Sequence, residues 1–201
     1  EFNSNQDNLK EIPFNNTRVY NKTFMLGTDK FGRDVLSRII VGSRISFYIG
    51  FVSVFISLVI GIFLGSLAGY YSGIIDTIIM WIINIVWSIP TLLLVIAISL
   101  AIGKGVWQVF LAVGLTMWVE VARLVRGQVK QYKERKFVIA AKVMGLGDMK
   151  IIFRHIIPNL TSSLIVISAT NFAASILIES GLSFLGIGVQ PPICLLYTSD
   201  A

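Results

Sequence analysis

The sequence predicts an all-α, polytopic membrane helix bundle. Hydrophobic residues make up 55% of the chain and charged residues only 14%, a composition far from that of an ordinary soluble domain. The mean hydropathy of +0.77 agrees with this assignment. The apolar residues form long runs without charge rather than alternating patterns, and such runs are typical of helices that cross a bilayer.

The runs predict four membrane spans. The first contains no charge from Ile45 to Ile75, and a helix over its first 26 residues is roughly 39 Å long, enough to cross a hydrocarbon core of about 30 Å. The second carries Pro90, which should kink its helix because proline lacks a backbone N–H. The predicted spans are about residues 45–70, 77–103, 106–122 and 158–179.

The loop between the third and fourth spans, residues 123–157, is strongly basic. Its Lys and Arg residues far outnumber its two acidic residues, Glu134 and Asp148. Short cytoplasmic loops accumulate Lys and Arg. We therefore expect this loop inside the cell and the polar segment 1–44 outside.

The two ends of the chain are unusual for a membrane protein. No apolar segment precedes Ile45 to carry an external segment across the membrane, so we expect the chain to lack an upstream span. Residues 193–201 do not continue the pattern before them. We expect this tail to be atypical and not native.

The basic loop has the pattern of a helix, a turn and a second helix. Residues 137–144 favour a helix, and Gly145 and Gly147 permit the positive backbone dihedral angles found where helices end. Asp148 is suited to cap a second helix that begins at Met149. So much local order in a connecting loop favours a docking function.

The faces of these two helices extend the docking hypothesis. Small Ala140 and Ala141 leave a shallow surface into which another protein can fit, and Ile152 and Ile156 share one face of the second helix. Pro158 suits the first turn of the next span. The alternative is an amphipathic hairpin that lies on anionic lipid.

Other residues suggest packing and not chemistry. Gly61, Gly65 and Gly69 recur at every fourth position, which lets another helix approach closely. Glu120 precedes Arg123 at helical spacing, which predicts an ion pair near the cytoplasmic end and not a proton relay.

Neither a metal site nor a nucleic-acid site is expected. His155 is the only histidine and has no second ligand at metal spacing. The basic residues form no recognition motif interleaved with aromatic residues. Glu179 ends an apolar run near the expected outer side, where an interfacial carboxylate is the simplest interpretation.

The loop resembles the coupling motif of type I ABC importer permeases. That motif reads Glu-Ala-Ala, three residues, Gly, nine residues, Ile, one residue, Leu-Pro. Ile139 stands in the place of the Glu, His155 in that of the Ile and Ile157 in that of the Leu. The matching positions are Ala140, Ala141, Gly145 and Pro158.

Three further stretches strengthen the resemblance, which covers about residues 24–192. The sequences GTDKFGRDVLSRIIVGSRIS, ARLVRGQV and ESGLSFLGIGVQPP are similar to segments of the C-type dipeptide, oligopeptide and nickel permeases. The resemblance implies a permease domain over residues 45–192. It also implies about six spans in a full-length subunit, of which this chain holds four.

The resemblance implies a permease in a bacterial inner membrane that works with partners. These are a homologous second permease, two cytoplasmic ATPase subunits and an external substrate-binding protein. We expect no catalysis and no cofactor in this chain, and Gly103-Lys104 is not part of a phosphate-binding loop. The residues implied to form the coupling loop are Ala140, Ala141, Gly145, Gly147, Asp148, Ile152, His155, Ile156 and Pro158.

Several functions remain open from the sequence. Dipeptides, longer peptides and nickel are all candidate substrates for a permease of this kind. A passive channel would not need an ordered basic loop, and an intramembrane enzyme would need paired polar groups inside its spans. The loop therefore favours an ATP-driven permease.

Overall fold

The fold is described by a computed structural model that places residues 24–29, 32–103 and 106–186. The tail expected at residues 193–201 and most of the segment expected to precede the first span lie outside the described residues. No strand forms within the described ranges, which confirms the predicted all-α class. The helices are α1 (Val35–Tyr71), α2 (Gly73–Ser88), α3 (Thr91–Ile102), α4 (Val106–Lys133), α5 (Lys136–Val143), α6 (Asp148–Ile151) and α7 (Thr161–Phe184).

Three helical stretches are long and apolar enough to cross a membrane. They are Val35–Tyr71, Trp107–Lys133 and Asp148–Phe184. The last of these runs from α6 through a π-helical stretch, Ile152–Ile156, and a 3-10 turn, Ile157–Leu160, into α7. Helices α2 and α3 meet the same criterion only as a pair, so the described residues offer three spans, or four if the pair counts as one broken span.

The prediction of a single kinked helix over residues 77–103 is wrong. The chain forms two helices there, α2 and α3, with a bend of 93° between them. Ile89 ends α2 in an extended conformation, with φ −94° and ψ 130°, and Pro90 then caps α3. The ring of a proline disfavours helical dihedral angles at the residue before it, so the chain leaves the helix at Ile89. We call this bend the elbow.

Helices α1 and α4 form the central contact of the bundle. A Cβ atom added to Gly65 would lie 2.5 Å from the carbonyl oxygen of Ala122, and one added to Gly69 would lie 2.8 Å from that of Arg126. Gly61 meets α4 in the same way, since an added Cβ would lie 2.5 Å from the Val121 side chain. The glycine repeat thus packs within this chain, and both helices run in the same direction.

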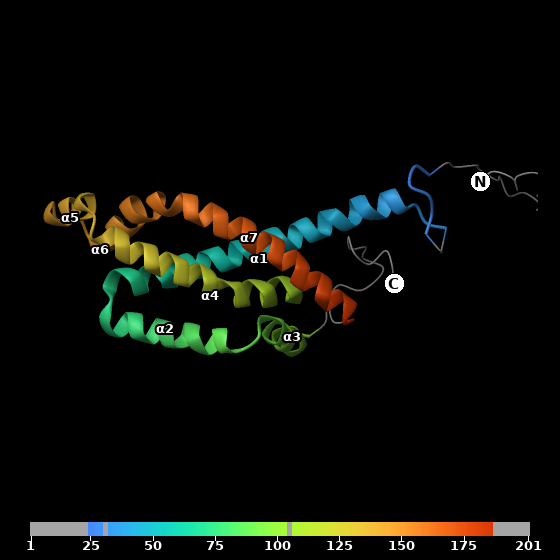
Figure 1. Cartoon of the computed structure of the whole chain (residues 1–201), viewed down its shortest axis with the longest axis horizontal. Helices are drawn as coiled ribbons and strands as arrows, with labels where there is room; N and C mark the ends of the chain where they lie inside the picture. The colour runs from blue at the N-terminus through green and yellow to red at the C-terminus, as the bar shows by residue number, and fades with distance from the viewer. Residues whose placement is uncertain (1–23, 30–31, 104–105, 187–201) are drawn as a thin grey trace, which may run out of the picture.

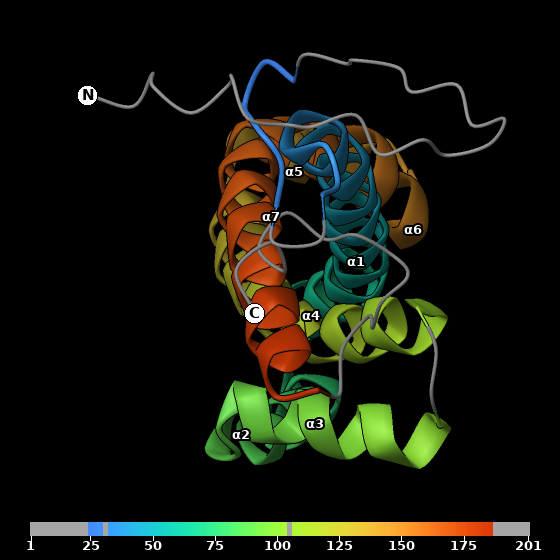
Figure 2. The same cartoon turned by 90° about the vertical axis from the view of Figure 1, so that its right-hand side faces the viewer.

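The other helices are arranged around this pair (Figures 1 and 2). Helix α7 packs along α1 and α4, whereas α2 lies along α4 and bends into α3 at the elbow. Helices α5 and α6 lie at one end of the bundle, close to the turn between α1 and α2 (Figure 1). We call this end the loop end.

The glycine contact leads to a prediction about stability. An alanine at Gly65 should destabilise the full-length protein by about 1–3 kcal/mol, because the added methyl group meets the α4 backbone and the helices must separate. Gly127 on α4 is the matched control, since an added Cβ meets no atom within 4 Å. There alanine should be neutral or stabilise the helix by up to ~1 kcal/mol. Thermal unfolding in detergent tests both variants, and equal stability would contradict the close contact.

Candidate functional site

The loop between α4 and α7 is an ordered structure at the loop end of the bundle. Two residues separate α4 from α5, and the backbone N–H of Arg135 donates to the carbonyl oxygen of Tyr132 at 3.0 Å. After the turn that follows α5, α6 begins at Asp148. The predicted helix, turn and helix are therefore present.

The turn after α5 depends on Gly145. This residue has φ +77°, a left-handed conformation that side chains with a Cβ rarely adopt. The N–H of Leu146 donates to Ala141 O at 3.2 Å, and the N–H of Gly145 donates to Lys142 O at 3.0 Å. These two bonds form a Schellman motif, which ends the helix and reverses the chain.

Gly147 and Asp148 have different roles from those expected. Gly147 has φ −64° and caps α6 without needing a positive dihedral angle. Asp148 lies inside the first turn of α6 instead of capping it, and its carboxylate accepts a hydrogen bond from the Tyr70 hydroxyl at 2.7 Å. The bond to Asp148 reaches across 78 residues of sequence. It fastens the loop to the end of α1.

A second contact reinforces this connection. Lys133, the last residue of α4, donates from Nζ to the backbone oxygen of Tyr70 at 2.6 Å. The same ammonium group lies 5.5 Å from the centre of the Tyr70 ring, within the range of a cation–π interaction. Tyr70 is only 4% exposed and joins α1, α4 and α6 at one point.

One face of the loop is buried against the bundle. Val138 and Ala141 of α5 pack into the same core as Val125 and Val129 of α4. Ala141 is 1% exposed, so our expectation that it lies on a docking surface is wrong. Its small side chain instead lets α5 lie close to the bundle. Further members of this core from the loop are Ile151, Ile152, Ile156 and Leu160.

The opposite face of α5 is exposed and carries several apolar residues beside Lys136. Val143 is 83% exposed and Met144 is 71% exposed. Together with Ile139 and Ala140, both exposed, they form what we call the cap surface. The sequence analysis found Ala140 but missed Val143 and Met144, although each lies four residues after another member of the surface. That spacing on a helix was the available signal.

A broad hollow adjoins the cap surface at Ile139. It has a volume of about 570 Å³. Lys130 and Glu134 bring charges of both signs to its wall. Its remaining lining residues are Ser72, Gln131 and Lys133. An apolar surface beside a polar, charged hollow is the composition expected of a protein contact.

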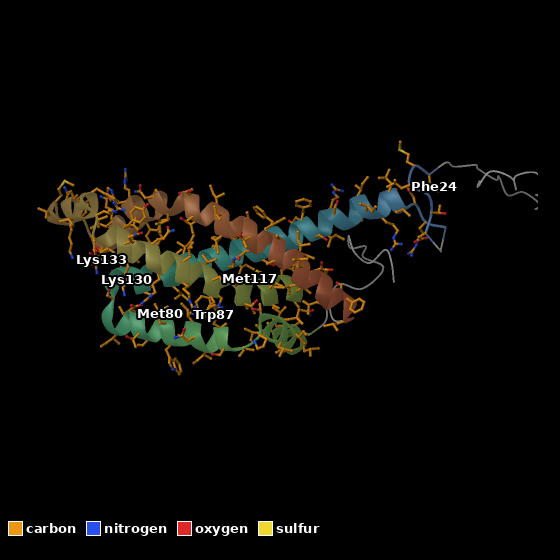
Figure 3. The ribbon with its side chains drawn as sticks, viewed as in Figure 1. Phe24, Met80, Trp87, Met117, Lys130 and Lys133 are labelled. Carbon is orange, nitrogen blue, oxygen red and sulfur yellow. The ribbon has the colours of Figure 1, made fainter. Side chains whose placement is uncertain are left out.

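The basic residues of α4 are engaged within the chain. Arg126 donates from Nη2 to Asp76 Oδ2 at 2.7 Å and from Nε to Oδ1, and Lys130 Nζ lies 3.2 Å from Asp76 Oδ2. Figure 3 shows Lys130 and Lys133 near the loop end. These ion pairs hold the start of α2 against α4.

The predicted ion pair between Glu120 and Arg123 is wrong. Arg123 donates from Nη2 to Asn84 Oδ1 at 3.2 Å, and its guanidinium carbon lies 3.6 Å from the centre of the Trp87 ring. Both partners belong to α2. A guanidinium group stacks well on an aromatic face. Arg123 therefore contacts α2 instead of pairing with Glu120 on its own helix.

Glu179 of α7 is fully buried among the helices, and the Ser183 hydroxyl donates to its Oε1 at 2.7 Å. His155 is half-buried in the π-helical stretch, and no group of three possible metal ligands occurs among the residues described. Pro158 lies in the 3-10 turn before α7, which begins at Thr161.

Comparison with known proteins identifies relatives of this chain. Residues 61–198 match the family described as binding-protein-dependent transport system inner membrane component. This match extends into the tail that we expected at residues 193–201.

Curated relatives match most of the chain. The oligopeptide transport system permease protein OppC of Bacillus subtilis is 38% identical over 172 residues, which cover 86% of this chain and 56% of that protein. The dipeptide transport system permease protein DppC of Lactococcus lactis is 38% identical over 175 residues, covering 87% and 51%. OppC of Escherichia coli K12 is 41% identical over 167 residues, covering 83% and 55%. The chain thus spans about half the length of the curated relatives it matches.

A solved structure shares the fold. It is described as inward facing conformations of the MetNI methionine ABC transporter, and the TM-score is 0.61 over 76% of each chain. The sequence identity is 20%, so this likeness supports the arrangement of helices alone.

The turn leads to a prediction with a close internal control. Valine at Gly145 should destabilise the loop by about 1–3 kcal/mol, because a β-branched residue is strained at φ +77°. Valine at Gly147, where φ is −64°, should cost less, because it lacks the backbone strain and only the weaker N-cap preference of valine acts there, although the surroundings of both glycines are equally open. Amide hydrogen exchange over residues 136–151 of the full-length protein measures the difference. Equal exchange in the two variants would contradict the role of the turn.

The Tyr70 contact leads to a second prediction. Tyr70→Phe removes the hydroxyl donor to Asp148 but keeps the ring, which should lower the free energy needed to open α6 by about 1–3 kcal/mol. Tyr71→Phe is the control, because Tyr71 is 40% exposed and contacts Tyr70 through its ring. Hydrogen exchange at residues 148–152 should quicken only in the Tyr70 variant. Unchanged exchange there would show that this bond does not fasten the loop.

Proposed function

Because this chain belongs to the family of binding-protein-dependent transport system inner membrane components, we propose that it is the permease part of an ATP-driven importer of dipeptides or oligopeptides. The observation that carries the proposal is the ordered loop, whose exposed cap surface on α5 is fastened to α1 and α4 through Tyr70. The names of the similar permeases support peptides over nickel as the substrate.

In this proposal the loop end faces the cytoplasm. The excess of Lys and Arg in residues 123–157 supports that orientation. The segment 1–44 then lies outside, and the bundle over residues 45–192 forms one side of a translocation path. A homologous second permease completes the path, and an external binding protein delivers the substrate.

Two cytoplasmic ATPase subunits are the proposed partners of the loops. One ATPase subunit receives the cap surface, in which Val143 and Met144 are the most exposed side chains. ATP hydrolysis belongs to these subunits, and this chain transmits their movement. Gly145 and the buried Ala141 shape and seat the loop, whereas Ala140 contributes to the contact itself.

The coupling geometry favours this proposal over a passive channel or a hairpin on lipid. A passive channel has no need for a loop that a long-range hydrogen bond and a buried core hold against two helices. A hairpin on lipid would immerse Val143 and Met144 in the bilayer surface. A charge at Val143 or Met144 would therefore weaken ATPase binding only if the loop docks on the ATPase. It would not do so in a passive channel or in a hairpin on lipid.

The corresponding test places a charge on the cap surface. Val143→Asp should lower retention of the ATPase subunit by about tenfold or more, because a carboxylate would be desolvated in the contact. The fold should survive, since Val143 is 83% exposed. The measurement is co-purification of the ATPase with the full-length permease, together with peptide uptake.

Met25→Asp provides the matched control. Met25 is 90% exposed and precedes α1 at the opposite end of the molecule, where Phe24 is labelled in Figure 3. The control should retain the ATPase as the wild type does. Normal retention and uptake in the Val143 variant would overturn the docking role of the cap surface and favour the hairpin on lipid.

A further inference from the structure

A cavity of about 210 Å³ lies at the elbow, between α2, α3, α4 and α7. Figure 3 labels two of the residues that line it, Trp87 on α2 and Met117 on α4. Leu94 of α3 and Ile178 of α7 add to its apolar wall. The cavity is therefore built from four helices that come together only in the folded bundle.

Glu120 brings the cavity its single charged side chain. It lies within the span Trp107–Lys133, close to the basic end of that span, and its side chain is exposed. Among the described residues no ion pair or hydrogen bond engages its carboxylate, and the nearest cation in sequence, Arg123, is held by Asn84 and Trp87. An ionisable group within a span is costly and marks a functional site by default.

The chemistry of the cavity suits one kind of ligand. A single carboxylate, set between apolar side chains and the hydroxyl groups of Thr91 and Thr116, complements a primary ammonium group attached to a small body. Metal ions are usually held by several carboxylate, imidazole or thiolate ligands, and the residues that line this cavity include no second carboxylate, histidine or cysteine. The volume is below the roughly 300–1,000 Å³ typical of sites for drug-sized ligands. It fits the end of a peptide and not a whole peptide.

We propose that Glu120 binds the α-ammonium group of a peptide during its passage, with Trp87 and Met117 lining the space for its first side chain. This inference rests on the proposed function as a peptide permease. It assigns the amino-terminal end of the substrate to the elbow of this chain. The elbow itself shapes the site, because Ile89 and Thr91 on either side of Pro90 both line the cavity.

The test uses the full-length permease assembled with its second permease, ATPase subunits and binding protein in proteoliposomes. Trialanine is the probe. Glu120→Gln keeps the shape of the side chain but removes its charge, so uptake at low peptide concentration should fall about tenfold or more through a higher KM. Glu120→Asp retains the charge and should recover most of the uptake. ATPase retention should stay unchanged in both variants.

A second measurement detects the contact directly in the wild type. A carbodiimide joins a carboxylate to a nearby amine as an amide, while the reagent takes up the oxygen as a urea. Trialanine should therefore be coupled to Glu120 in preference to Glu134, an exposed glutamate near the loop end of the same chain. N-acetyl trialanine has no free amine and should not be coupled. Mass spectrometry of the α4 fragment reports the product even if a variant fails to assemble.

The outcomes separate this inference from the proposed function. Trialanine uptake by the wild type, with normal uptake in Glu120→Gln and no preference for coupling at Glu120, would overturn the inference and leave the peptide permease intact. An assembled wild type that transports no peptide would overturn both. Preferential coupling at Glu120 together with the KM effect would establish the site.

Discussion

The close contact between α1 and α4 is the constraint on which the rest of the structure depends. Three glycines on α1 bring its backbone against α4 so closely that any added Cβ would overlap. Lipid supplies no hydrophobic force between helices, so such contacts rely on close packing over a long surface. The contact fixes α1 and α4 in parallel along the bundle. Tyr70, in the last turn of α1, and Lys133, the last residue of α4, are consequently brought together at the loop end.

The loop can act as a rigid part of the bundle because its attachments lie on that fixed pair. Asp148 binds the hydroxyl of Tyr70, and Ala141 packs into a core shared with α4. The Schellman turn at Gly145 then sets the direction of the chain into α6. A partner that pushed on the exposed side of α5 would therefore act on a loop whose backbone is held by these contacts. In the proposed function this order would let the loop pass a partner's movement on to α1 and α4.

The sequence was sufficient for the features that depend on local pattern. Long apolar runs predicted the helix bundle, the glycine repeat predicted a close helix contact, and Gly145 was correctly assigned to a left-handed turn. The errors concern contacts across the chain. Nothing near Arg123 in the sequence shows that Trp87 and Asn84 lie beside it, and nothing near Ala141 shows which side of α5 is covered. The size of the bend at Pro90 was also missed, since a proline removes one hydrogen bond but does not set the angle between the two helices.

The basic charge of the loop end has a structural use that the sequence did not indicate. Arg126 and Lys130 neutralise Asp76, Arg123 stacks on Trp87, and Lys133 holds the end of α1. These contacts bind α1 and α2 to α4, so the charges that indicate orientation also fasten the helices. The remaining Lys and Arg residues of the loop are exposed, and they are Arg135, Lys136, Lys142, Lys150 and Arg154. In the proposed function a partner would meet these charges together with the cap surface. Because Arg123 is held by α2, the carboxylate of Glu120 has no counter-charge among the residues that the structure describes. That carboxylate lines the cavity at the elbow, where only Ile89 and Pro90 separate α2 from α3.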